Sequence, residues 1–221
     1  MKTFPSFEYE QRFASQIVVG IDEAGRGPWA GPVVAAAVIV LDKEAFLNLF
    51  SEINDSKKLS GVRRKYFFDK LTEADCVLQC TGSATVEEID SLNILNATLL
   101  AMRRAYLGLC ESAAKTELPQ ITGKSIILVD GNKAIDAGVP CYPIIKGDSK
   151  SYSIASASII AKVSRDGVMS ELAKDSPQYH WEKNAGYGTK EHQEAIAKYG
   201  ITVHHRKSYA PIAKLLRQAA F

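Results

Sequence analysis

The stretch GIDEAGRGPWAGPVVAAAVIV, residues 20–40, decides the fold of this chain. Apolar runs rich in β-branched residues lie at 17–21 and 33–41, and a turn rich in glycine and proline joins them, which predicts a β-hairpin. The first run ends in two adjacent carboxylates, Asp22 and Glu23. A turn with so few side chains lets the main chain come close to a ligand, and the two acids place negative charge beside it.

The segments after this hairpin show both strand-like and helix-like patterns. Residues 125–131, SIILVDG, form a short continuous apolar run that ends at Asp-Gly, which predicts a buried central strand; residues 141–148 repeat that plan. The remaining segments are predicted as a strand at 76–85 and helices at 43–50, 61–71, 86–109, 149–173, 189–198 and 208–219. This order predicts an α/β fold with a mixed sheet flanked by helices and a C-terminal helical segment.

The bulk composition narrows the class of protein. The chain has 221 residues and a net charge of only +2, so the composition alone does not identify a charged partner. Its four cysteines are irregularly spaced and form no C-x-x-C pair, which favours reduced thiols. The longest apolar run, 33–41, is too short to span a membrane, and the first 13 residues lack the apolar core of a signal peptide. We therefore expect a soluble cytoplasmic protein.

Acidic residues end three of the apolar runs. Asp22 and Glu23 follow the first, Asp130 the run at 125–129, and Asp148 the run that begins at Cys141. If these strands are neighbours, four carboxylates share one end of the sheet, where they raise each other's pKa unless a cation neutralises them. Oxygen ligands of this kind suit Mg²⁺ or Mn²⁺, and a pair of such ions is the usual device for phosphodiester cleavage. A single Asp-Gly more often only ends a strand, but three acidic strand ends together favour a metal site.

Three other segments have residue types that contact nucleic acids. NDSKKLS, residues 54–60, offers Asn54, Lys57 and Lys58 before a predicted helix, where a phosphate could bind, although a helix cap with solvated lysines is the more common role of such a segment taken alone. Tyr187 lies between two glycines and could stack on a base or a sugar, although a packed core aromatic is equally common.

The third segment, HHRKSY at 204–209, is a small basic patch that includes Arg206. All four histidines lie between positions 180 and 205, but they are spread over different local elements, so we do not expect a histidine metal site.

In their order along the chain, these motifs resemble the signature blocks of bacterial ribonuclease HII, the type 2 ribonuclease H. The resemblance rests on GIDEAGRGPWAGPVVAAAVIV (20–40), NDSKKLS (54–60), EEIDSLNILNATLLAMRRA (87–105), LVDGN (128–132), KGDSKS (146–151), IASASIIAKVSRD (154–166), GYGTKEH (186–192) and HHRKSYAP (204–211). Together these motifs are highly specific, and they cover nearly all of the chain between residues 20 and 211.

The resemblance implies a ribonuclease H-like fold with a mixed five-stranded sheet. It implies a core at 1–180 and a C-terminal helical segment at 181–221 that completes the substrate cleft, and both are expected to be parts of one continuous domain. It also implies a monomeric endonuclease that cleaves RNA in RNA–DNA hybrids, and that cleaves on the 5′ side of single ribonucleotides embedded in duplex DNA.

By the same resemblance, each motif carries a role. Asp22, Glu23, Asp130 and Asp148 are the catalytic, metal-binding carboxylates, with two divalent ions when substrate is bound. The main chain of Gly25, Arg26 and Gly27 contacts the 2′-hydroxyl, and Tyr187 senses the junction between ribonucleotide and deoxynucleotide. The expected substrate-binding residues are Gly25, Arg26, Gly27, Asn54, Lys57, Lys58, Tyr187 and Arg206.

Two departures from the family pattern stand out. Asn184 and Ala185 occupy positions where basic residues are common, so weaker contact with the nucleic-acid backbone is expected there. Tyr152 occupies a position where small residues are common. Two alternatives stay open: another nuclease of the same fold, such as ribonuclease HIII, and a hybrid-binding module without catalytic activity.

Overall fold

The computed structural model describes residues 4–13, 16–116, 121 and 123–218. Five strands form one sheet in the spatial order β3-β2-β1-β4-β5. The strands are β1 (Ile17–Ala24), β2 (Val33–Val40), β3 (Val77–Ala84), β4 (Ser125–Asp130) and β5 (Cys141–Ile144). The pairs β1–β2 and β2–β3 are antiparallel, whereas β1–β4 and β4–β5 are parallel. The prediction of a mixed five-stranded sheet is therefore confirmed.

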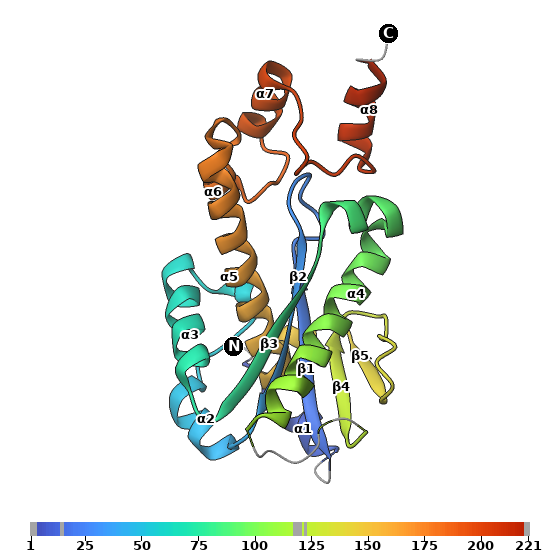
Figure 1. The fold of residues 1–221 in the computed structure, drawn as a ribbon. Coiled ribbons are helices and arrows are strands. Elements are labelled where there is room, and N and C mark those ends of the chain that lie inside the picture. The colour runs from blue at the N-terminus through green and yellow to red at the C-terminus, as the bar shows by residue number, and fades with distance from the viewer. Residues whose placement is uncertain (1–3, 14–15, 117–120, 122, 219–221) are drawn as a thin grey trace.

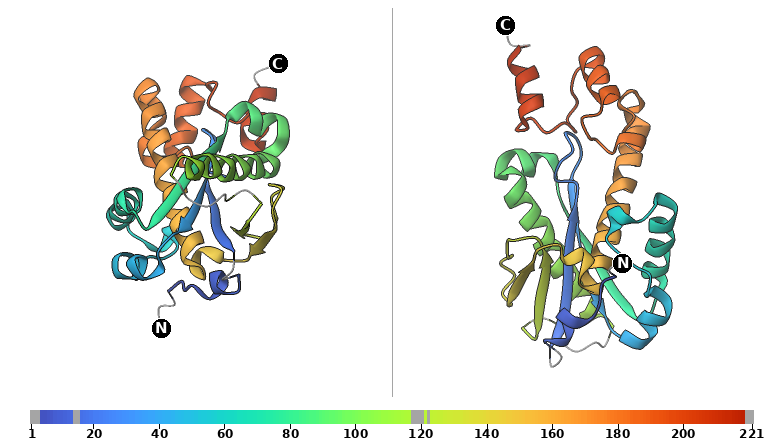
Figure 2. Two further views of the ribbon diagram at one scale, coloured as in Figure 1. Left: turned by 60° about the horizontal axis from the view of Figure 1, so that its bottom comes forward. Right: turned by 180° about the vertical axis from the view of Figure 1, so that it is seen from behind.

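Helices cover both faces of this sheet (Figures 1 and 2). The α-helices are α1 (Glu8–Gln11), α2 (Lys43–Phe50), α3 (Gly61–Glu73), α4 (Val86–Ala114), α5 (Tyr152–Asp175), α6 (Trp181–Asn184), α7 (Lys190–Tyr199) and α8 (Ala210–Gln218). Three short 3₁₀ helices are η1 (Ser56–Lys58), η2 (Gly147–Ser149) and η3 (Pro177–Tyr179). Among the described helices, none combines the length and the apolar character needed to cross a membrane.

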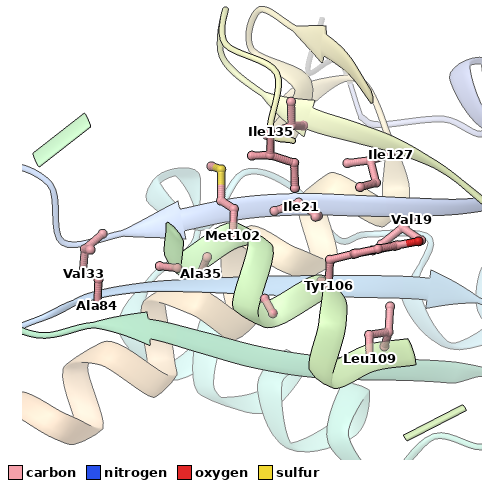
Figure 3. Packing of buried hydrophobic residues seen from close by; sticks show 14 of the residues in the cluster. Val19, Ile21, Val33, Ala35, Ala84, Met102, Tyr106, Leu109, Ile127 and Ile135 are labelled. Carbon is pink, nitrogen blue, oxygen red and sulfur yellow. The ribbon is translucent and has the colours of Figure 1, made fainter. Parts of the chain in front are cut away.

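The core is divided by the sheet into two layers. On one face α4 packs against β1, β2 and β3, and its Met102, Tyr106 and Leu109 meet Val19 and Ile127 of the strands (Figure 3). On the other face α2, α3 and α5 bury a second apolar cluster. Burial of these apolar surfaces holds the strand ends rigid, so side chains at those ends are placed precisely.

The helix predicted at 86–109 is interrupted. It begins with a capping box between Thr85 and Glu88, but Asn93 adopts φ 67° and ψ 163°, which no helical residue does. The Asn93 side chain accepts hydrogen bonds from the amides of Leu95 and Asn96, at 3.0 and 3.1 Å, so it caps a second helix that continues to Ala114. The long helical region predicted at 86–109 thus consists of two helices, because a capping residue can restart a helix within an apolar pattern.

The segment at 141–148 also differs from its prediction as a second buried central strand. β5 has only four residues and forms the edge of the sheet, with Tyr142 and Pro143 exposed. Proline is tolerated there because an edge strand has one unpaired side. After the strand, Lys146 adopts a left-handed conformation that turns the chain into η2, where Asp148 lies.

The C-terminal elements gather at one end of the sheet. Helices α6, α7 and α8 lie at the same end as the turn between β1 and β2 (Figure 1). An apolar cluster takes Ala30 from that turn, Met169 from α5, and Trp181, Ile196 and Ile212 from the C-terminal elements. An isolated bridge between Ala30 and His205 joins the same parts. The division at residue 180 remains a prediction, and residues from both sides of it share this cluster.

Candidate active site at the end of the sheet

Three carboxylates meet at the end of the sheet that carries the glycine-rich turn. Asp22 lies two residues before the end of β1, and Asp130 is the last residue of the parallel neighbour β4; each lies one residue beyond the registered pair Ile21↔Val129. Asp148 comes from η2, which is held there because the amide of Gly147 donates to Asp130 Oδ1 at 2.6 Å. One oxygen from each of the three carboxylates lies within 4.8 Å of the others. The predicted convergence of carboxylates is therefore observed for these three side chains, although Asp148 comes from η2 and not from the end of a strand.

Burial makes this arrangement electrostatically costly. Asp22 is 6% exposed, and burial followed by the charges of Glu23 and Asp130 raises its pKa well above the usual value. Asp148 is 7% exposed, and burial followed by the charges of Asp130 and Asp55 raises its pKa to about 6. Three ionised carboxylates are therefore stable together only with a cation between them. A compact set of hard oxygen donors fits a divalent ion such as Mg²⁺ or Mn²⁺.

A pH dependence of stability follows for the metal-free protein. Because the folded state raises the pKa of Asp148 from 3.8 to about 6, the folded state binds the proton more tightly than the unfolded state does. Below about pH 4 the Asp148 carboxyl is protonated in both states. Above pH 6 it is ionised in both states, and its ionisation is unfavourable only in the folded state. Wild type should therefore be less stable than Asp148→Asn at pH 7, by at most about 3 kcal/mol, and this difference should shrink as the pH falls to 5. Urea unfolding of both proteins with EDTA at pH 5, 6 and 7 measures it, and a constant difference would contradict the assigned pKa.

Glu23 lies beside this cluster rather than within it. Glu23 follows Asp22 in β1, and its carboxyl group still reaches that of Asp22, with which it hydrogen-bonds. Its Oε1 pairs with Arg26 Nη1 at 3.3 Å. Burial raises the pKa of Glu23, while the Arg26 charge opposes that shift. Glu23 and Asp130 line one cavity of about 200 Å³, so Glu23 stays near the cluster.

The glycine-rich turn uses its glycines in two different ways. Gly25 is buried with φ +98°, and a methyl group there would lie 2.0 Å from Arg165 Nε, so the fold itself requires glycine. Gly27 is exposed, and a methyl group there would lie 3.4 Å from Cε1 of Tyr187. Of these two glycines, Gly27 is the one that leaves the main chain open toward solvent. A larger residue at Gly25 would clash within the fold rather than keep a ligand away, because its side chain would point inward.

The ring of Tyr187 is thus brought next to the glycine-rich turn, and it is 47% exposed. A buried chain of hydrogen bonds positions its main chain. The indole of Trp181 donates to His192 Nε2 at 3.1 Å, so His192 Nδ1 carries the proton and donates to the Tyr187 carbonyl at 2.9 Å. His205 Nε2 also donates to His192 Nε2, at 3.1 Å.

His192 and His205 therefore hold neighbouring groups of the C-terminal segment in place by hydrogen bonds. Burial lowers the pKa of His192, and burial with the neighbouring histidines lowers that of His205 to about 4. Both rings are neutral at pH 7. The surprise is that His192 and His205, which belong to different local elements, pack directly against each other.

Asn184 and Ala185, the departures from the family pattern, build the turn before Tyr187. The buried Asn184 side chain donates to the Tyr179 carbonyl at 2.7 Å and accepts from the Gly186 amide at 2.8 Å. Ala185 adopts φ +48°, and its carbonyl accepts from Arg165 Nη1 at 2.9 Å. The Asn184 side chain is therefore turned inward, away from solvent.

The segment at 54–58 lies close to the acidic cluster. Asp55 caps η1 by accepting from the Lys57 amide at 2.8 Å. Burial alone lowers the pKa of Lys57, but the charges of Asp22, Asp55 and Asp148 outweigh it and the pKa is raised. Lys57 and Lys58 are exposed, and Lys58 Nζ donates to Oδ1 of the buried Asn54 at 3.4 Å. Lys57 is thus an ammonium group beside the carboxylates.

Arg206 corrects the sequence prediction. It was expected to be an exposed phosphate contact in a basic patch, but it is 0% exposed and its guanidinium donates to main-chain carbonyls of the glycine-rich turn. A fully buried group cannot contact a phosphate in solution. The local pattern HHRKSY gives no sign of this, because burial here depends on a turn about 180 residues earlier in the chain.

Two residues near the site were missed by the sequence analysis. Asp55, whose carboxyl group hydrogen-bonds that of Asp148, lies in a motif that was interpreted only as a phosphate site. Arg165 is buried and lies on the same helical stripe as Ala161 and Met169. That spacing of four residues is a signal that the Arg165 side chain points into the core.

Comparisons with known proteins agree with this geometry. The family model for Ribonuclease HII matches residues 19–212. Ribonuclease HII of Wolbachia pipientis wMel is 46% identical over 96% of this chain and 99% of its own length. The crystal structure of ribonuclease H2 from Pyrococcus horikoshii OT3 has a TM-score of 0.67 at 25% identity, covering 91% of this chain and 97% of that one. The crystal structure of Bst-RNase HIII in complex with Mn²⁺ has a TM-score of 0.68 at 21% identity, and the similarity covers 97% of this chain and 74% of the Bst-RNase HIII chain.

The third similarity concerns the fold alone, whereas the family match and the first relative extend over nearly the whole chain at high identity. The ribonuclease H-like fold expected from the sequence is confirmed. The chain belongs to the ribonuclease HII family.

Proposed function

We propose that this chain is a metal-dependent endoribonuclease that cleaves RNA in RNA–DNA hybrids and on the 5′ side of single ribonucleotides in duplex DNA. The observation that carries the proposal is the convergence of Asp22, Asp130 and Asp148, with one oxygen from each within 4.8 Å of the others. Membership of the ribonuclease HII family supports the same activity. We further expect it to act as a monomer in the cytoplasm.

The three carboxylates would hold the divalent cation, Mg²⁺ or Mn²⁺, and Glu23 would take part from the adjoining cavity. When bound, divalent ions activate water and stabilise the charge that develops on a phosphodiester. The role of the protein is to fix the ligands: the Gly147 amide orients Asp130, and the Glu23 amide donates to Asp22 Oδ1 at 2.7 Å. The expected products have 5′-phosphate and 3′-hydroxyl ends.

The residues around the cluster supply substrate recognition in this proposal. Gly27 presents exposed main chain beside the ring of Tyr187, so the ribose would lie against Gly27 and the next sugar against the ring. Only the 2′-hydroxyl distinguishes the ribose from its deoxy neighbours. Lys57 lies beside the carboxylates, and Lys58 and Asn54 adjoin it, so these three residues would contact the phosphate backbone.

A cleavage assay tests the function. Labelled RNA–DNA hybrid and an all-DNA duplex of the same sequence are incubated with the protein and Mg²⁺, Mn²⁺ or EDTA. We expect cleavage of the RNA strand only, and only with a divalent ion; Asp148→Asn should be inactive under every condition. Intact RNA with both metals, while the protein binds the hybrid, would instead indicate a binding module without catalytic activity.

The two lysines of η1 give a separate prediction about salt. Each exposed lysine that neutralises one phosphate contributes about 0.9 to the slope of log affinity against log salt concentration. Lys57→Ala and Lys58→Ala should each flatten that slope by roughly this amount, and equally for duplexes with and without a ribonucleotide. Fluorescence anisotropy at several salt concentrations measures it, with the exposed Lys70→Ala, in the last turn of α3, as control. Slopes equal to wild type would show that both lysines are solvated surface residues.

A further inference from the structure

The guanidinium of Arg206 is completely occupied by the glycine-rich turn and its surroundings. An arginine has five N–H donors, and five acceptors lie around this one. They are the carbonyls of Gly31 (2.9 Å from Nε), Arg26 (3.1 Å from Nη1), Gly25 (2.6 Å from Nη2) and Pro32 (3.2 Å from Nη2), and the hydroxyl of Tyr209 (2.8 Å from Nη1). Four of the five acceptors belong to residues 25–32, so Arg206 holds the shape of that turn.

These bonds decide which way two peptide groups point. All described peptide bonds are trans, so the carbonyl of one residue and the amide of the next point in opposite directions. The carbonyls of Gly25 and Arg26 point inward to Arg206, and the amides of Arg26 and Gly27 therefore point outward. Residues 26 and 27 are exposed, and within the described part of the chain neither amide makes a hydrogen bond.

The carbonyl of Arg26 is also unable to accept further donors. Arg206 Nη1 and the hydroxyl of Tyr209 both donate to it, which uses its two lone pairs. The two peptide groups between Gly25 and Gly27 therefore offer a ligand only N–H donors. A hydroxyl oxygen placed against it would accept hydrogen bonds, and the hydrogen of that hydroxyl would have to donate elsewhere.

A second buried arginine connects the turn to the segment of Tyr187. Arg165 donates to the carbonyls of Pro32 at 3.0 Å, Ala30 at 3.1 Å and Ala185 at 2.9 Å. Neither Arg165 nor Arg206 forms an ion pair with a carboxylate in the described chain. Two buried guanidinium groups whose acceptors are peptide oxygens and one tyrosine hydroxyl are unusual, because buried charges normally have a counter-ion. Their positive charge polarises the peptides that they bind and strengthens the outward amides as donors.

We propose that Arg206 is a positioning residue for ribose recognition: by holding the carbonyls of Gly25 and Arg26 inward, it aims the amides of Arg26 and Gly27 at the 2′ oxygen. The inference rests on the proposed function, because it assumes that the ribose lies against Gly27. Lysine cannot replace this arginine, because an ammonium has three donors and no planar fork to span several carbonyls. The charge would be kept while the peptide orientation is lost.

Binding measurements isolate this role. In the Asp22→Asn background, which should leave the substrate intact, anisotropy compares a duplex containing one ribonucleotide with the all-deoxy duplex of the same sequence. Arg206→Lys should lower the ratio of the two affinities about tenfold, the loss expected for one or two hydrogen bonds, while affinity for the all-deoxy duplex changes less than about twofold. Lys207→Ala, an exposed neighbour, is the matched control and should weaken both duplexes together with the ratio unchanged.

The outcomes separate this inference from the proposed function. The positioning role is overturned, and the proposed function is left intact, if the Arg206→Lys protein folds and its ratio of affinities for the two duplexes equals that of the Asp22→Asn reference protein. If Arg206→Lys does not fold, Tyr209→Phe decides: it removes one donor from the Arg26 carbonyl, so the ratio should fall about threefold, and an unchanged ratio overturns the inference. If the reference protein itself shows no preference for the ribonucleotide, ribose recognition by this site is wrong and the inference falls with it.

Discussion

Asp22→Asn is expected to reduce cleavage of an RNA–DNA hybrid by about a thousandfold or more, while the metal-free protein keeps or gains stability. Activity is lost because asparagine carries no negative charge, so one of the three converging side chains no longer binds the divalent cation as a carboxylate. The stability follows because burial and the charges of Glu23 and Asp130 make ionisation of Asp22 costly in the folded state. Asparagine has nearly the same shape and still offers an oxygen to the Glu23 amide.

Initial rates with Mg²⁺ and urea unfolding with EDTA measure the two parts of this prediction. Asp69→Asn is the matched control, because it makes the same chemical change on α3, where Asp69 pairs with Lys65 on the surface. Its rate should equal that of wild type. Full activity of Asp22→Asn in Mg²⁺ would show that Asp22 is not part of the active site. A strong loss of stability in the metal-free protein would show that the carboxylate stabilises the fold.

Tyr187→Ala is expected to change substrate preference more than overall activity. The ring is half exposed and lies next to Gly27, so it is placed to contact the sugar that follows a ribose held there. A deoxyribose fits against the ring, and a further 2′ oxygen would crowd it. Stacking contacts of this kind contribute about 1–3 kcal/mol, so cleavage at a single ribonucleotide should fall about 10- to 100-fold. Cleavage within continuous RNA should fall much less.

The ratio of the two rates is the quantity to measure, and Tyr187→Phe is its control. Phenylalanine keeps the ring and removes only the hydroxyl, so the ratio should stay near that of wild type. If Tyr187→Ala also kept the wild-type ratio, the tyrosine would be a packing residue. Junction sensing would then have to come from another part of the protein.

Those parts of the fold that depend on local signals could be predicted from the sequence. The strand at 33–41 and the helix at 43–50 agree with β2 and α2 to within one residue. The β-branched run specifies the strand, and the side chain of Asp42 caps the helix by accepting from the amides of Glu44 and Ala45. The meeting of Asp22 and Asp130 was also predictable, because parallel neighbouring strands end at the same edge of a sheet.

Features that depend on distant contacts could not be predicted. The burial of Arg206 requires the turn at 25–32, and the edge position of β5 requires the order of strands in the sheet. Tyr152 was an unexplained departure from the family pattern; the structure buries it, with ring centroids 4.9 Å from Phe7 and 5.4 Å from Phe46. Neither partner is near Tyr152 in sequence, so no local pattern could show that an aromatic ring is needed there.

The cut position in a duplex that contains one ribonucleotide tests the central claim most directly. The labelled strand is incubated with wild-type protein and Mg²⁺ or Mn²⁺, and the products are mapped at single-nucleotide resolution with the chemistry of both ends determined. The account predicts one cut, on the 5′ side of the ribonucleotide, leaving a 5′-phosphate on the fragment that carries it and a 3′-hydroxyl on the other. A cut on the 3′ side with a 2′,3′-cyclic phosphate would contradict it, because the 2′-hydroxyl would then be the nucleophile rather than the group that the glycine-rich turn recognises.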